Sequence, residues 1–196
     1  MPATTVKLIS SDTSSTTRPD GLDLEAGSLR VRGRRLAGGR CDGVLLVELV
    51  AGDTTAWVLP DRGLGIWKAV AGSVEVGWRS PVAGPVHPRF VPLAEASGLG
   101  WLDGFDELVA RCGLVSNGAP DFDERGRLRH PLHGRIANLP AHELAVTLHE
   151  AAGTITLTGT VDETRFLCHA LRMKTSMTLR ADRPGVAWID TVTKSP

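Results

Sequence analysis

Four neighbouring residues, His133, Gly134, Arg135 and Asn138, combine side chains that can exchange hydrogen bonds with a polyol. Imidazole and amide groups can both donate and accept, while the planar fork of a guanidinium can span two adjacent oxygens. A glycine beside the histidine lets the backbone approach a ligand closely. We interpret this group as a carbohydrate contact. The alternative is that Arg135 and Asn138 bind loop carbonyls while His133 caps a strand.

The surrounding stretch, residues 98–141, mixes aromatic, acidic, basic and amide side chains with breaks at glycine and proline. Strands of a sandwich do not need this mixture, whereas a polyol pocket does. The indoles of Trp101 and Trp78 can stack on the apolar face of a pyranose, although core packing is the ordinary role of tryptophan. We interpret the stretch as the floor of a carbohydrate pocket.

A metal site is the main chemical alternative for the two histidines. His130 and His133 have the spacing His-x-x-His, and Cys112 lies upstream. However, Pro131 separates the histidines, and no carboxylate or second cysteine stands at ligand spacing. The sequence also lacks a glycine-rich phosphate loop, a G-x-S-x-G elbow and a C-x-x-C pair. We therefore expect no metal and no cofactor.

Composition narrows the class of protein further. The 196 residues carry 22 basic and 22 acidic side chains, which argues against nucleic acid as a partner. The arginines between residues 30 and 40 are therefore interpreted as a solvated strand face. Three cysteines without close pairing predict reduced thiols and a cytoplasmic protein. No apolar run approaches the length of a membrane span, so we expect no membrane partner.

The pattern of hydrophobic residues predicts an all-β sandwich. Residues 1–40 are expected to form a polar N-terminal arm and edge strand, and residues 41–196 one sandwich domain. Alternating or wholly apolar runs between turn residues are typical of short strands. Such runs occur at residues 44–50, 55–59, 64–70, 74–77, 144–149, 154–161, 168–181 and 186–192.

Two segments interrupt the strands. Residues 80–92 contain four prolines and are expected to form an irregular loop, where His87 is a candidate ligand contact. Residues 103–112 are expected to form the one short helix. Asp103 would cap this helix, the apolar residues at 105, 108 and 109 would form one face, and Gly113 would follow its last turn.

Ordered motifs give the chain a family resemblance. They are Leu59-Pro60-Asp61-Arg62-Gly63-Leu64, Gly77-Trp78-Arg79-Ser80-Pro81, Gly100-Trp101-Leu102-Asp103-Gly104-Phe105, Arg111-Cys112-Gly113-Leu114 and Pro131-Leu132-His133-Gly134-Arg135-Ile136-Ala137-Asn138. In this order they resemble an aldose 1-epimerase-like, galactose mutarotase-like family, the DUF4432 group, over residues 43–193.

The resemblance implies a β-supersandwich and a sugar or modified-sugar ligand. It implies a contact between His133 and the sugar near its anomeric centre. It also implies pocket positions for Arg62, Arg111, Arg135 and Asn138. From the residues alone, Arg62 at a strand corner could point into a pocket or pair with Asp61.

Mutarotation needs an acid and a base within hydrogen-bond reach of the sugar. In the family these are a histidine of a later strand and a late glutamate, and the chain resembles the N-terminal part of such a protein. We therefore expect a truncated, catalytically incomplete epimerase-like protein that binds sugar. The alternatives are a non-catalytic sugar-binding module and a structural half-sandwich that associates with another chain, for example as a homodimer through open sheet edges.

Overall fold

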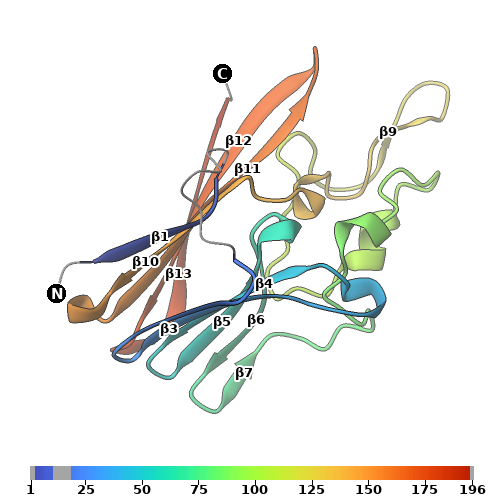
Figure 1. Cartoon of the computed structure of the whole chain (residues 1–196). Helices are drawn as coiled ribbons and strands as arrows, with labels where there is room; N and C mark the ends of the chain where they lie inside the picture. Colours follow the sequence, from blue (N-terminus) through green and yellow to red (C-terminus); the bar gives the residue numbers. More distant parts are fainter. Residues whose placement is uncertain (1–2, 11–18, 195–196) are drawn as a thin grey trace.

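Two antiparallel sheets lie face to face in the computed structural model, which describes residues 3–10 and 19–194 (Figure 1). The first sheet has the strand order β1-β10-β11-β12-β13, and the second the order β2-β3-β4-β5-β6-β7. Strands β8 and β9 form a separate hairpin. The bounds are β1 Thr4–Ile9, β2 Leu22–Ala26, β3 Leu29–Arg35, β4 Leu45–Ala51, β5 Thr54–Leu59, β6 Gly65–Ala71, β7 Val74–Val76, β8 Asp121–Phe122, β9 Leu128–His130, β10 Glu143–His149, β11 Thr154–Arg165, β12 His169–Arg180 and β13 Arg183–Lys194.

The alternation along β11 shows why these segments become strands. Ile155, Leu157 and Val161 are buried in the space between the sheets, while Thr156 is half-buried and Thr158 is exposed on the opposite face. Leu144 of β10 and Met177 of β12 face the same core. Successive side chains of a strand point to opposite faces of the sheet, so this alternation gives the sheet one apolar face and one face rich in hydroxyl groups.

Strand β4 is apolar on both faces. Leu45, Val47 and Leu49 belong to the main core between the sheets. Leu46 points to the opposite side, where Trp57 and other partly buried side chains cover it in a smaller cluster. A nearly continuous apolar run is expected for a strand that is covered on both faces. The all-β class predicted from the sequence is therefore confirmed.

The first forty residues contribute strands to both sheets. Strand β1 pairs with β10 at the edge of one sheet, and β2 and β3 precede β4 in the other. The guanidinium of Arg30 lies 2.8 Å from the Asp23 carboxylate, and Arg32 lies 3.5 Å from Glu48. These arginines of β3 therefore lie on a solvated strand face, as expected. Part of the predicted arm, residues 11–18, falls outside the described residues.

The helix expected at residues 103–112 is absent, and this prediction was wrong. A 3₁₀ helix, Gly100–Gly104, covers only the first two residues of that segment, and the chain then runs extended beside β6. The amides of Leu108 and Val109 donate to backbone carbonyls of β6 at 2.9 and 3.0 Å. A helix of about ten residues is marginal in isolation. Pairing with the backbone of β6 stabilises the extended form instead, together with the hydrogen bonds that Glu107 and Asp106 accept from Arg62 and Trp67.

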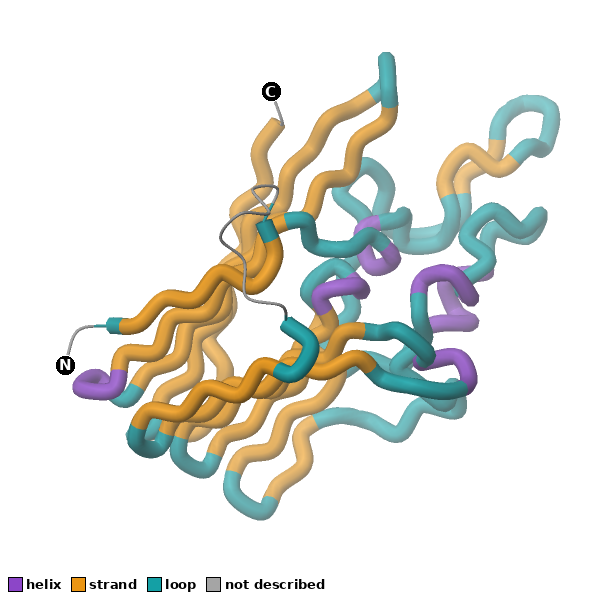
Figure 2. Tube along the Cα trace, viewed as in Figure 1, coloured by secondary structure: helices purple, strands orange, loops and turns teal. Residues whose placement is uncertain are grey.

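Loops and most of the short helices gather beside one end of the sandwich (Figure 2). The proline-rich loop predicted at residues 80–92 is irregular apart from one 3₁₀ turn. Among the described residues, no helix is long and apolar enough to cross a membrane. The other 3₁₀ helices are Gly39–Cys41, Pro60–Arg62, Pro88–Phe90, Ile136–Asn138 and Glu150–Ala152.

Candidate functional site

His133 lies in a tight turn with a left-handed backbone. Its φ is 53° and that of Gly134 is 67°. A histidine with positive φ is uncommon, so the surroundings must hold it in place. The amide of His133 donates to the Gly118 carbonyl at 2.9 Å, and its own carbonyl accepts from the Gly113 amide at 2.6 Å. The turn crosses the backbone of residues 113–116 at Gly134. A Cβ on Gly134 would lie 2.4 Å from the Ser116 carbonyl oxygen, so only glycine fits at this crossing.

The imidazole of His133 packs edge-on against the indole of Trp101, with ring centroids 4.7 Å apart. His133 Nδ1 and Trp101 Nε1 are both buried, and neither has a hydrogen-bond partner among the described residues. A buried polar atom without a partner costs about 1–3 kcal/mol. Two such atoms lie here on adjacent rings, and no side chain or backbone group among the described residues satisfies them.

Aromatic rings continue from this pair along the irregular segment. Trp101 contacts Phe105 at 4.8 Å between centroids, and Phe105 contacts Trp78 at 5.0 Å. Trp101 is 4% exposed, whereas Trp78 is 43% exposed. Phe105 therefore lies between the two tryptophans that the sequence suggested as sugar contacts, and of these Trp101 is buried and Trp78 is exposed.

Arg62 lies beneath the site rather than at its surface. It is 1% exposed, and its Nε donates to Glu107 at 2.7 Å. Its other nitrogens donate to the Gly104 carbonyl at 2.9 Å and to Asn138 Oδ1. Arg62 therefore pairs with Glu107, not with Asp61 as the sequence allowed. In this arrangement Arg62 fixes the irregular segment against the corner that follows β5.

Asn138 is 8% exposed and is held by the same arginine. Its Nδ2 is buried and, within the part of the chain that the structure describes, has no hydrogen-bond partner. The two N–H groups of the Asn138 amide are therefore without a partner in that part of the chain.

Arg111 joins the irregular segment to the first sheet. Its side chain donates to the Gly63 carbonyl at 3.1 Å, to Thr175 of β12 at 3.1 Å and to Asp190 of β13 at 2.5 Å. It also lies 4.0 Å from the ring of Trp188. With 5% exposure and this many partners, Arg111 acts here as a bridge between layers.

Arg135 and His87 lie in two other environments. Arg135 is exposed and shares a shallow depression with Glu163 and His169 at the far end of β11 and β12. His87 Nδ1 accepts from the Arg89 amide at 3.1 Å, and burial together with the Arg89 charge lowers the pKa of His87. Among the described residues, no hydrogen bond joins His87 to the His133 turn.

Asp106 is a notable polar residue that the sequence interpretation missed. We assigned this acid to the start of a helix, but the structure buries it to 6% exposure beside Trp67, which donates to its Oδ2 at 2.8 Å. Burial and the neighbouring Glu107 raise the pKa of Asp106 to about 6. The extended segment could not be derived from the local pattern, so the sequence carried no signal for this position.

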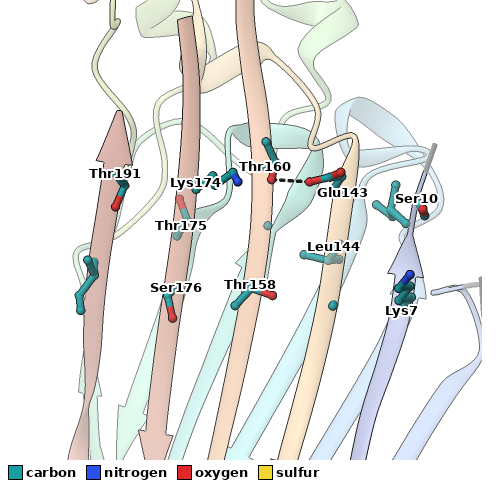
Figure 3. Close-up of a pocket in the computed structure, with 14 residues that line it drawn as sticks. Lys7, Ser10, Glu143, Leu144, Thr158, Thr160, Lys174, Thr175, Ser176 and Thr191 are labelled. Atoms are coloured by element: carbon teal, nitrogen blue, oxygen red, sulfur yellow. Dashed lines mark hydrogen bonds between the residues drawn. The ribbon is translucent and has the colours of Figure 1, made fainter. Parts of the chain in front are cut away.

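A separate depression of about 460 Å³ lies on the outer face of the first sheet (Figure 3). Hydroxyls and lysines line it together with Ala145 and Ile189, since the outward positions of β10 to β13 are mostly polar. Its carboxylate, Glu143, already accepts from Thr160 at 2.8 Å. No cluster of metal-ligating side chains occurs within residues 3–10 and 19–194.

Comparison with known proteins places this architecture among aldose 1-epimerase-like folds. A family described as "Domain of unknown function (DUF4432)" matches residues 41–195, and the chain belongs to this family. A crystal structure described as that of a candidate aldose 1-epimerase from Klebsiella pneumoniae subsp. pneumoniae is 26% identical, with a TM-score of 0.88. The match covers 98% of this chain and 52% of the other, so the chain spans about half the length of that protein. No curated protein matches the chain.

Proposed function

We propose that this chain binds an aldose in its ring form at the His133 turn, as part of an aldose 1-epimerase-like site. The observation that carries the proposal is the pair of buried nitrogens, His133 Nδ1 and Trp101 Nε1, which have no partner in the described structure. The likeness to a candidate aldose 1-epimerase supports the same ligand class. The resemblance of Leu132, His133 and Gly134 to the Leu-His-Gly motif of mutarotases also supports a position of His133 near the anomeric centre.

The chemistry of the turn suits a sugar hydroxyl. A neutral imidazole offers one donor and one acceptor, and an indole N–H offers a donor only. A hydroxyl can accept from Trp101 and donate to His133, and it would then satisfy both nitrogens. The amide of Asn138 offers a further donor from the adjacent 3₁₀ helix.

Rapid interconversion of anomers needs more than this turn. General acid–base catalysis requires two groups positioned on the anomeric hydroxyl and the ring oxygen. Within residues 3–10 and 19–194, no hydrogen bond or ion pair joins the His133 imidazole to a carboxylate. We therefore expect sugar binding with little anomer exchange from this chain.

Two measurements test the proposal together. Isothermal titration calorimetry with galactose and glucose should show binding that His133→Ala weakens about tenfold or more, since a buried hydrogen bond is lost. His149→Ala, which changes a histidine of β10, serves as the matched control and should bind as the parent does.

Saturation-exchange NMR on the same sugars measures anomer interconversion. Exchange close to the uncatalysed rate is expected. Fast exchange would overturn the claim of incomplete catalysis. Absence of binding to all aldoses tested, or binding unaffected by His133→Ala, would overturn the assignment of the site.

A structural role in association is the second candidate, and β13 favours it. This twelve-residue strand lies at the edge of its sheet, with Ile189 67% and Val192 51% exposed. An exposed apolar edge strand is a template for pairing with another chain. A concentration-dependent dimer in light scattering, abolished by Ile189→Lys, would support this role. A strict monomer would exclude self-association through β13.

A further inference from the structure

A hollow of about 400 Å³ lies beside the second sheet, and its lining includes neither His133 nor Trp101. Its walls come from Trp67 and Lys68 of β6, Glu75 of β7, residues 78–80 and 82–84, and Asp106. Binding sites for small molecules are ordinarily concave, contain apolar or aromatic side chains and carry a few fixed polar groups. Two indoles and one buried carboxylate give this hollow that composition.

The carboxylate of Asp106 is fixed and half satisfied. Its Oδ2 accepts from the Trp67 indole at 2.8 Å, while its Oδ1 is buried without a partner among the described residues. A Cβ on Gly84 would lie 1.8 Å from Oδ2, so the backbone at Gly84 packs directly on the carboxylate. An unsatisfied carboxylate oxygen in the wall of a hollow is an acceptor suited to a ligand donor.

Trp78 supplies an aromatic surface whose orientation is fixed. Its Nε1 donates to the Glu107 carbonyl at 3.1 Å, and its ring packs on Phe105. Ser80, which follows in the same segment, donates to the Phe105 carbonyl at 2.8 Å. Trp78 is nevertheless 43% exposed. An indole that is anchored through its N–H and still exposed is well suited to stack on a ligand.

The charges around the hollow balance one another. Lys68 lies 3.8 Å from Glu75 and 4.9 Å from the centre of the Trp67 ring. Arg79 is exposed and makes no ion pair within the described part of the chain, while Asp106 is the opposing acid. Neither sign dominates, which favours a neutral ligand with several hydroxyls over a strongly charged one.

We propose that this hollow is a second carbohydrate site, which binds a neutral pyranoside between Trp78 and Asp106. The apolar face of the sugar ring stacks on Trp78, and a hydroxyl donates to Asp106 Oδ1. The depression on the outer face of the first sheet is a weaker candidate, because none of its side chains is a buried group without a partner (Figure 3). The second site needs no free anomeric hydroxyl, so it is independent of the function proposed above.

Methyl β-glucopyranoside and methyl β-galactopyranoside are the probes, since a methylated anomeric oxygen prevents mutarotation. The chain has five tryptophans, so single Trp→Phe substitutions can assign each indole N–H resonance. Either probe should shift the Trp78 and Trp67 resonances saturably. Trp78→Ala should abolish this binding, while Trp78→Phe, which retains an aromatic face, should preserve it. Asp106→Asn replaces the free acceptor with a donor and should weaken binding about tenfold.

The outcomes separate this site from the first. His133→Ala should leave glycoside binding unchanged and should weaken only free-aldose binding. Glycoside binding that survives Trp78→Ala, or that shifts Trp101 and is lost in His133→Ala, would overturn the second site. Failure of both glycosides to bind while free aldoses bind would overturn it as well, and would leave the His133 proposal standing. Backbone amide spectra of each variant establish that it is folded.

Discussion

The sandwich and the irregular segment beside it, residues 77–142, place their charged groups in opposite ways. In the sandwich, apolar side chains fill the interior, and the ion pairs of β3 lie at the surface. The irregular segment instead directs charged side chains inward, where Asp106, Glu107 and Arg111 are at most 6% exposed. Apolar packing thus stabilises the sandwich, whereas buried charged side chains stabilise the backbone of the irregular segment.

The difference follows from where backbone hydrogen bonds can be made. In a sheet, each strand satisfies the peptide groups of its neighbour, so side chains need supply only apolar area. The irregular segment has few ladder partners, and side chains must take their place. Arg62 accordingly binds the Gly104 carbonyl, Arg111 binds the Gly63 carbonyl, and Glu163 accepts from the Leu114 amide at 3.0 Å. Removal of one partner from such a buried pair should therefore cost more stability than removal of a surface charge.

The largest effect is expected for Glu107→Ala. Removal of this carboxylate leaves the guanidinium of Arg62, 1% exposed, without its 2.7 Å partner. Loss of one member of a buried ion pair costs about 3–5 kcal/mol. Chemical denaturation should show this loss of unfolding free energy. A change below about 1 kcal/mol would mean that the pair does not hold the irregular segment.

A smaller effect is expected for Gly134→Ala, at the crossing that supports the His133 turn. The added Cβ would meet the Ser116 carbonyl oxygen at 2.4 Å and the Gly113 Cα at 2.8 Å. We expect a loss of about 2–4 kcal/mol from overpacking and backbone strain, together with weaker aldose binding. Gly126→Ala is the matched control, since Gly126 also has positive φ but has no atom within 4 Å of an added Cβ. Equal losses in both variants would show that the crossing contributes nothing.

The buried Asp106 should make stability depend on pH. Burial and Glu107 raise its pKa from 3.8 to about 6, against the opposing effects of Trp67, Arg62 and Lys68. The folded state therefore holds a proton that the unfolded state releases, and the resulting stability is lost as pH rises from about 4 through 6. Relative to the parent, Asp106→Asn should gain about 1–3 kcal/mol between pH 4 and pH 8, since each unit of pKa difference corresponds to about 1.4 kcal/mol.

Asp162→Asn supplies a control of opposite sign. The hydrogen bond from Arg172 lowers the pKa of Asp162, so the stability it contributes is present at neutral pH and lost as pH falls. The variant should therefore be less stable than the parent at neutral pH and approach it in acid. A pH dependence of Asp106→Asn that runs in this same direction would contradict the assigned burial of Asp106.

The smallest effect is expected for Arg30→Ala on β3. The Arg30 side chain lies at the surface, where its pairs with Asp23 and Glu25 are solvated. Exposed ion pairs contribute little to stability, and salt weakens them further. Denaturation at low and high salt should show a small, salt-sensitive loss. A loss as large as that of Glu107→Ala would remove the distinction between the two regions.

This contrast also explains how much could be predicted from the sequence. The alternation of apolar and polar residues predicted β10, β11 and β12. In a strand with one buried face, every second side chain points into the core, so the sequence itself shows the strand. The same reasoning placed a helix at residues 103–112, since the apolar spacing there fits a helix. It could not show that the amides of this segment pair with β6.

The candidate site divides in the same way. Short sequence motifs identified His133 and Trp101 as candidates, and the structure brings their rings together. The directions of the other candidate side chains depend on partners that are distant in the sequence. Arg62 and Arg111 bind groups 45 and 79 residues away, so their inward direction could not be derived from neighbouring residues. Asp106 was missed for the same reason.

The indole N–H resonance of Trp101 offers the most direct test of sugar binding at the His133 turn. Its nitrogen is buried and lacks a partner among the described residues, so a new hydrogen bond from it would shift the resonance strongly. Titration with free galactose or glucose should produce a saturable shift in the parent protein and a much smaller one in His133→Ala. A Trp101 resonance that stays unchanged while an aldose is shown to bind elsewhere would contradict the assignment of the site.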